Sequence, residues 1–181
     1  RDLKAFIRMV SLADDLGIDS ISVGNTLAFL TECIERGYLS PNDLGGVNFT
    51  WGDGETYARA IAWVALKDGP NTAFGLKLGD LIAKGVKYIA EQIERKKGIK
   101  DQWKIAYQAK GNELAGHHPR NKLPQYHGYW AGFTYITGNR GGCHLEGSEC
   151  WRLYADKDKD PWPSRSQDTK AVTDSLVTCF F

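Results

Sequence analysis

The stretch "DDLGID", Asp14 to Asp19, opens with a carboxylate, carries a glycine three residues later and closes with a second carboxylate. The apolar residues before it recur at the spacing of an α-helix. They are Leu3, Phe6, Ile7, Val10 and Ala13. Glycine is common at the left-handed position that follows a helix. The stretch therefore predicts a helix that ends near Asp14 and a turn at Gly17.

A second hexapeptide near the other end of the chain repeats this layout. "DSLVTC", Asp174 to Cys179, carries Val177 where the glycine stood and closes with a cysteine. For a single copy, a helix that ends in a glycine cap is a sufficient explanation, and a lone cysteine is more often a buried apolar residue than a ligand. In the functional interpretation, the free backbone groups of the helix end and the carboxylates bind an N–H-rich heterocycle.

The rest of the chain shows helical periodicity and glycine stops, so the fold is predicted to be mainly α. Asp53 or Thr56 is expected to cap a helix, whereas residues 103–111 alternate as an extended segment does. Further helices are expected over 22–36, 73–84, 86–96, 126–142 and 167–177, and a polar loop over 155–166.

A connection rich in glycine, proline and histidine over 111–124 divides this pattern. Such an irregular segment is typical of the boundary between two structural units. We therefore predict one domain over 1–115 and a second over 116–181.

Charge and hydropathy exclude several classes of partner. The formal net charge is +1 and the lysines and arginines are scattered, which argues against nucleic acid or a membrane surface. No apolar run is long enough to span a bilayer and no signal-peptide layout opens the chain. We expect a cytoplasmic protein. Because both ends lie inside patterned sequence, we also expect a fragment of a longer one.

The cysteines and histidines leave two interpretations open. The four cysteines show no close pairing, so each is either a buried apolar residue or a metal ligand: Cys33, Cys143, Cys150 and Cys179. A zinc site could be formed by one group of residues, but their spacing fits no familiar zinc pattern and surface histidines are the favoured interpretation. The group is His117, His118, His127 and Cys143. In "NRGGCH", two glycines that allow close backbone approach lie beside Arg140 and His144, which places these side chains well to face a cavity.

Four stretches in a fixed order carry a more specific signal. They are "DDLGIDSISVGNTLAF", "KGNELAGHHPR", "YITGNRGGCH" and "TDSLVTC". This set resembles the aldehyde:ferredoxin oxidoreductase family of tungsten enzymes across nearly the whole chain. The resemblance implies the later part of that family's middle helical domain and the start of its C-terminal helical domain. A tungsten bis-pterin cofactor lies between the domains in that family.

The resemblance also implies roles for single residues. Asp14 and Asp174 would hydrogen-bond ring nitrogens of the two pterins. Cys179 would be a metal ligand, to a [4Fe–4S] cluster whose other three cysteines would lie before Arg1. His144 would be the catalytic proton-transfer residue near tungsten. The implied cofactor-binding residues are Asp14, Gly17, Ile18, Asp19, Arg140, Asp174, Thr178 and Cys179.

Three features depart from the family pattern. Val177 and Thr178 replace the Gly-Leu of the second hexapeptide, and a β-branched residue does not readily adopt a positive φ. His118, Pro119 and Arg120 stand where the family has Asp-Pro-Arg. The segment from 144 to 174 is short for the family. These departures indicate a divergent member whose aldehyde preference should not be inherited.

The function that the resemblance implies is the oxidation of a small aldehyde to a carboxylic acid, with electrons passed through the [4Fe–4S] cluster to ferredoxin or a similar carrier. Tungsten or molybdenum would be the metal, with magnesium bridging the pterin phosphates as a further option. A homo-oligomer stays open. The alternatives are a related enzyme acting on a sugar aldehyde or an aromatic acyl thioester, and a non-catalytic helical binding module.

Overall fold

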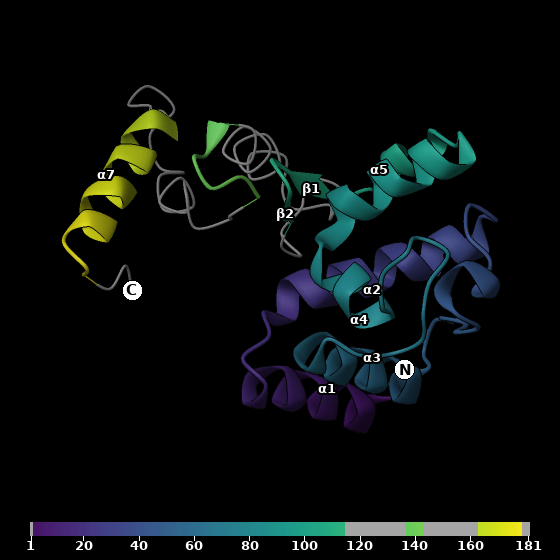
Figure 1. The fold of residues 1–181 in the computed structure, drawn as a ribbon. Helices are drawn as coiled ribbons and strands as arrows, with labels where there is room; N and C mark the ends of the chain where they lie inside the picture. Colours follow the sequence, from purple (N-terminus) through teal and green to yellow (C-terminus); the bar gives the residue numbers. More distant parts are fainter. Residues whose placement is uncertain (1, 115–136, 143–162, 179–181) are drawn as a thin grey trace. The chain divides into compact units, whose positions relative to one another are not determined.

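The computed structural model describes residues 2–114, 137–142 and 163–178. These residues are mainly helical, as predicted (Figure 1). The chain forms two compact units, Arg1–Glu113 and Leu114–Phe181, and each is described by itself. The assignment of 1–115 and 116–181 to two family domains stays a prediction.

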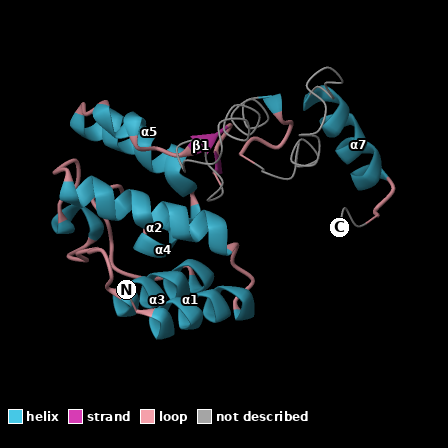
Figure 2. Cartoon of the chain, turned by 180° about the vertical axis from the view of Figure 1, so that it is seen from behind, coloured by secondary structure: helices cyan, strands magenta, loops and turns pink. Residues whose placement is uncertain are grey.

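The first unit is a bundle of short helices. Helix α1 lies alongside α3, and α3 packs on α4, while α2 contacts α4 and α5 (Figures 1 and 2). A two-residue antiparallel hairpin, β1 with β2, packs on α2 and α5. The elements are α1 (Leu3–Asp15), α2 (Ser20–Glu35), the 3₁₀ helix η1 (Pro41–Leu44), α3 (Gly54–Leu66), α4 (Leu78–Ala83), α5 (Gly85–Lys97), the 3₁₀ helix η2 (Asp101–Lys104), β1 (Gln108–Ala109) and β2 (Asn112–Glu113).

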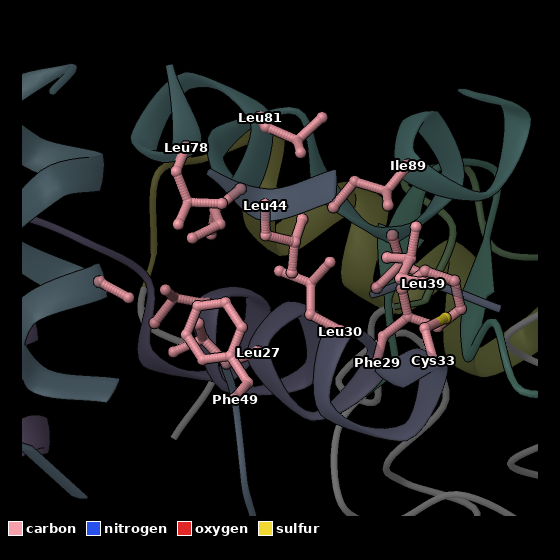
Figure 3. Packing of buried hydrophobic residues seen from close by; sticks show 14 of the residues in the cluster. Leu27, Phe29, Leu30, Cys33, Leu39, Leu44, Phe49, Leu78, Leu81 and Ile89 are labelled. Atoms are coloured by element: carbon pink, nitrogen blue, oxygen red, sulfur yellow. The ribbon is translucent and has the colours of Figure 1, made fainter. Parts of the chain in front are cut away.

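Helix α2 supplies the centre of the hydrophobic core. Leu30 of α2 is fully buried and points toward residues from η1, α4 and α5 (Figure 3). The other apolar residues of these elements that are at most 1% exposed are Cys33, Leu44, Leu78, Leu81, Val86, Ile89, Ala90 and Ile93. Each large buried side chain contributes about 1.5–3 kcal/mol relative to exposure. This core holds α2 from Val23 onward, so it positions the turn that leads into the helix.

Helix α4 approaches the end of α3 so closely that only glycine fits at its second position. The backbone N–H of Gly79 donates to the Asp68 carbonyl oxygen at 2.9 Å. A Cβ built on Gly79 would lie 2.1 Å from the Trp63 carbonyl oxygen and 2.7 Å from that of Asp68. The two helices are therefore in direct main-chain contact.

Two predicted helix boundaries are wrong. The helix expected over 73–84 begins only at Leu78, because Gly75 has a φ of +83° and Thr72 accepts and donates hydrogen bonds within the turn. The second unit's helix α7 (Pro163–Ser175) takes in the last residues of the polar loop expected over 155–166. Proline at the first position of a helix is favoured because its missing N–H has no partner to lose there.

The extended segment expected over 103–111 is only partly present. Residues up to Lys104 belong to η2, and the strand pair follows. Lys110 and Gly111 form the two-residue turn between β1 and β2, with φ values of 56° and 88°. Two consecutive positive φ values are typical of a type I′ hairpin.

In the second unit the structure describes α7 and a glycine turn over 137–142. The N–H of Gly141 donates to the Gly138 carbonyl oxygen at 3.2 Å. The amide of Gln167 on α7 donates to the Thr137 hydroxyl at 2.9 Å, which ties the turn to the helix. Most of the helix expected over 126–142 lies outside the described residues. None of the described helices is long and apolar enough to cross a membrane.

Candidate functional site

The first hexapeptide is a Schellman turn that ends α1. The N–H of Gly17 donates to the Asp14 carbonyl oxygen at 3.1 Å, and the N–H of Ile18 donates to that of Ala13 at 2.8 Å. Gly17 has a φ of +67°, as predicted. Ile18 packs against the core, and Ala13 is buried in it. The turn thus satisfies two terminal carbonyls of α1 and leads the chain directly into α2.

The second hexapeptide forms the same turn at the end of α7. The N–H of Val177 donates to the Asp174 carbonyl oxygen at 3.1 Å, and the N–H of Thr178 donates to that of Thr173 at 3.0 Å. Val177 has a φ of +55°. The left-handed conformation costs a residue other than glycine roughly 1–2 kcal/mol. The departure at Val177 therefore does not change the backbone path, but it strains it.

The carboxylates of the first hexapeptide have different surroundings. Asp19 is the N-cap of α2, since its Oδ1 accepts from the N–H of Ser22 at 2.6 Å. Asp14 is exposed, and within the described ranges its carboxylate makes no hydrogen bond or ion pair. Asp14 is thus available to a ligand, while Asp19 has a structural role that the sequence analysis missed. The sequence contains the signal for this cap, because an aspartate directly before a helix is a typical N-cap residue.

Two substitutions of Asp19 test its role as a helix cap. Asp19→Ala should lower the stability of the protein by about 1 kcal/mol through loss of the cap. Asp19→Asn should keep most of that stability, because asparagine caps helices as well as aspartate does. Thermal unfolding of both variants checks this. If Asp19→Asn were as unstable as Asp19→Ala, the charge rather than the cap would be the stabilising feature.

Asp174 of the second hexapeptide is ion-paired. The ammonium of Lys170, one turn earlier, lies 2.6 Å from Asp174 Oδ1. This hydrogen bond, aided by the charges of Lys170 and Arg140, lowers the pKa of Asp174. Two of the predicted site residues, Arg140 and Asp174, are therefore close enough to interact within the second unit. The carboxylate stays ionised at neutral pH, and among the described residues its Oδ2 has no hydrogen-bond partner.

Thr178 completes the described part of the second hexapeptide. Its hydroxyl donates to the Thr173 carbonyl oxygen at 3.2 Å, and its backbone N–H donates to the same oxygen. The side chain thus reinforces the turn. A cofactor contact of Thr178 stays a prediction.

Comparison with known proteins agrees with this pair of turns. The family model described as "Aldehyde ferredoxin oxidoreductase, domains 2 & 3" matches residues 1–181. The chain belongs to the aldehyde ferredoxin oxidoreductase family. It is 34% identical over 151 residues to the "Tungsten-containing aldehyde ferredoxin oxidoreductase" of Pyrococcus horikoshii, with 80% of this chain and 21% of the relative covered.

A relative with a different name aligns almost as well. The chain is 33% identical over 133 residues to the "Aliphatic sulfonate oxidoreductase, WOR-like subunit" of Pyrococcus furiosus. This match covers 74% of the chain and 19% of the relative. The chain therefore spans about a fifth of the length of the curated relatives it matches.

Several predicted site residues of this aldehyde ferredoxin oxidoreductase family member lie outside the described residues. They are His144 and Cys179, together with Cys143, Cys150 and the histidines at 117, 118 and 127. In the described part of the chain, no group of three His, Cys, Asp or Glu residues is arranged to hold a metal ion. The metal-ligand role of Cys179 and the catalytic role of His144 stay predictions.

Cys33 is an ordinary core residue. Its side chain is fully buried in α2, and burial raises the pKa of its thiol to about 12. Cys33 lies among apolar residues of the core, and no group of three His, Cys, Asp or Glu residues in the described ranges is arranged to hold a metal ion there. Of the two interpretations open for the cysteines, the buried apolar one holds for Cys33.

The "KGNEL" stretch has a structural role that local sequence patterns do not reveal. Glu113 is buried, and its Oε1 accepts from the N–H of Val86 at 2.8 Å. The carboxylate thereby satisfies one of the free N–H groups at the start of α5 and lies at the positive end of the helix dipole. Gly85 has a φ of +77°, which favours glycine, and a Cβ there would lie 2.5 Å from the same oxygen, so any larger residue would also displace the carboxylate.

An apolar cavity of about 230 Å³ lies next to the first hexapeptide. Ala13 and Ser20, on either side of the hexapeptide, form one end of its wall, and Trp51 and Tyr57 contribute aromatic rings. The wall also includes Phe6, Met9, Val10, Val23, Gly24, Leu27, Ala28 and Ile61.

Proposed function

We propose that the full-length protein is an oxidoreductase with a tungsten or molybdenum bis-pterin cofactor and a [4Fe–4S] cluster, and that it oxidises an aldehyde to a carboxylic acid. The observation that carries this proposal is the pair of matching turns at Asp14–Asp19 and at Asp174–Thr178, each of which places a carboxylate at a helix C-terminus. Two similar turns suit a cofactor with two similar halves.

The hydrogen-bond acceptors of each turn fit a pterin. The C-terminal end of a helix carries a partial negative charge, and an ionised carboxylate adds acceptors there. The pyrimidine edge of a pterin carries N–H donors, which these acceptors complement. Asp14 has both carboxylate oxygens available within the described residues, and Asp174 keeps one beside its ion pair with Lys170.

The bound cofactors would supply two-electron redox chemistry at a soft-ligated metal and one-electron transfer at the cluster. The chain's own residues would bind and orient them. Asp14, Gly17, Ile18 and Asp19 are proposed to hold one pterin, and Arg140, Asp174 and Thr178 the other, with Cys179 as a cluster ligand. His144 is proposed to accept or donate a proton at an imidazole nitrogen, since its ordinary pKa of about 6.5 lies near neutrality.

The overall reaction would convert an aldehyde and water to a carboxylic acid, two protons and two electrons. The proposed electron acceptor of the overall reaction is ferredoxin or a similar one-electron carrier. A magnesium ion is a further proposed component of the cofactor.

A second candidate is a related enzyme that acts on another substrate. It is supported by the relative named as an aliphatic sulfonate oxidoreductase subunit, which is 33% identical to this chain. Because a relative named as an aldehyde enzyme is similarly identical, at 34%, identity does not rank the two substrates. Turnover of the full-length protein with aldehydes and with aliphatic sulfonates, using a reducible dye as acceptor, separates them.

Cys179→Ser tests the cofactor assignment. In the full-length protein purified without oxygen, this variant should lose or convert the cluster, which changes the visible absorbance and the electron paramagnetic resonance signal. Cys33→Ala is the control, because this core thiol should affect only stability, by about 1 kcal/mol. An unchanged iron content and spectrum in Cys179→Ser would remove Cys179 from the cluster. A wild-type protein without tungsten, molybdenum or pterin would refute the proposed function.

A further inference from the structure

Val177 has a strained backbone conformation and an exposed side chain. Its backbone has a φ of +55°, a conformation that L-residues with branched side chains avoid. Val177 is 92% exposed, so no described residue of the second unit packs closely on its isopropyl group. The backbone strain of Val177 therefore lowers the stability of the protein, and its side chain recovers no stability through burial among the described residues.

The first hexapeptide shows that the turn itself does not need this side chain. The turn around Gly17 has the same two hydrogen bonds, donated by the N–H groups of Gly17 and Ile18, and a Cβ built on Gly17 would meet nothing within 4 Å. The position therefore faces open space in the first turn. In the second turn, Val177 extends an apolar group from the matching position.

The surroundings of Val177 combine an apolar surface with a fixed charge. Leu176, the residue before it, is 67% exposed, whereas Leu16 at the matching position of the first turn is 37% exposed. Asp174 on the same turn carries an ionised carboxylate, held by Lys170. An aromatic heterocycle with N–H donors on one edge complements this combination, because its edge can donate to the carboxylate while its apolar surface covers the aliphatic groups.

We propose that the isopropyl group of Val177 is a cofactor-positioning group that contacts the pterin held by Asp174. This inference rests on the proposed function. The contact would make the second turn a tighter clamp than the first, since the valine fills space that glycine leaves open. The left-handed strain is then maintained because the bound heterocycle covers the side chain.

Two substitutions separate contact from strain. Val177→Ala removes two methyl groups but keeps a Cβ at the strained position, whereas Val177→Gly removes both the contact and the strain. Val172→Ala is the matched control, because it takes the same two methyl groups from an exposed valine, 56% accessible, elsewhere on α7. The readout is the rate at which the full-length protein releases pterin in mild denaturant, followed by fluorescence of the oxidised pterin.

Val177→Ala and Val177→Gly should both release pterin roughly tenfold faster than the wild type, the effect expected from losing two covered methyl groups. Val172→Ala should release it at the wild-type rate. In protein made without tungstate and freed of pterin, Val177→Gly should unfold at a higher temperature than the wild type, because the strain is gone.

Wild-type release rates in both Val177 variants would overturn this inference while leaving the proposed function intact, since pterin would still be bound. A wild-type protein that contains no pterin would overturn both.

Discussion

A single methyl group added at Gly79 is expected to destabilise the protein by about 3 kcal/mol or more. The added Cβ of Gly79→Ala would lie 2.1 Å from the Trp63 carbonyl oxygen, which belongs to main chain and cannot rotate away. Helix α4 would have to separate from α3, which would also displace the buried Leu78 and Leu81. Thermal unfolding of the full-length protein and its yield after purification measure the effect.

Gly24→Ala is the matched control for this substitution. Gly24 lies in α2, and a Cβ built there meets nothing within 4 Å. Alanine in a helix is roughly 0.5–1 kcal/mol more stable than glycine, so this variant should be as stable as the wild type or more so. If both variants unfolded at the wild-type temperature, the close approach of α3 and α4 would be wrong.

His144→Asn is expected to lower kcat by about 10²–10⁴-fold, or roughly 3–5 kcal/mol of barrier. The reason is that asparagine can hydrogen-bond but cannot take or give a proton near neutral pH. Tungsten and iron contents should stay at the wild-type level. The measurement is kcat per tungsten atom in the full-length protein, with the aldehyde that the wild type turns over fastest.

A histidine with only a structural role would behave differently. Its substitution would reduce the cofactor content or the unfolding temperature, and turnover per bound metal would stay at the wild-type value. That second outcome would exclude His144 from the proposed mechanism. The two outcomes differ in which quantity falls, so one preparation decides between them.

The sequence predicts the first turn better than the second, for a physical reason. Gly17 indicates a left-handed backbone position, because glycine has no Cβ to clash in that conformation. Val177 carries no such signal, and its turn is recognisable only from the layout shared with the first hexapeptide. Similarly, the helix predicted from residue 73 has helical spacing, but the turn around Gly75 decides where α4 begins.

Contacts between residues far apart in the sequence could not be predicted from local sequence patterns. The bond between Glu113 and Val86 joins residues 27 positions apart, and the Gly79 contact depends on how two helices approach each other. In contrast, the ordered set of four stretches was sufficient to predict the family, because it combines residues from the whole chain.

The buried carboxylate of Glu113 also sets an order of events during synthesis. Translation adds about 5–20 residues per second, so Glu113, which lies 27 positions after Val86, leaves the ribosome about 1–5 s later than Val86. A helix forms within about a microsecond. The body of α5 can therefore fold in the nascent chain long before its first turn is secured, and that turn stays frayed until the hairpin closes on it.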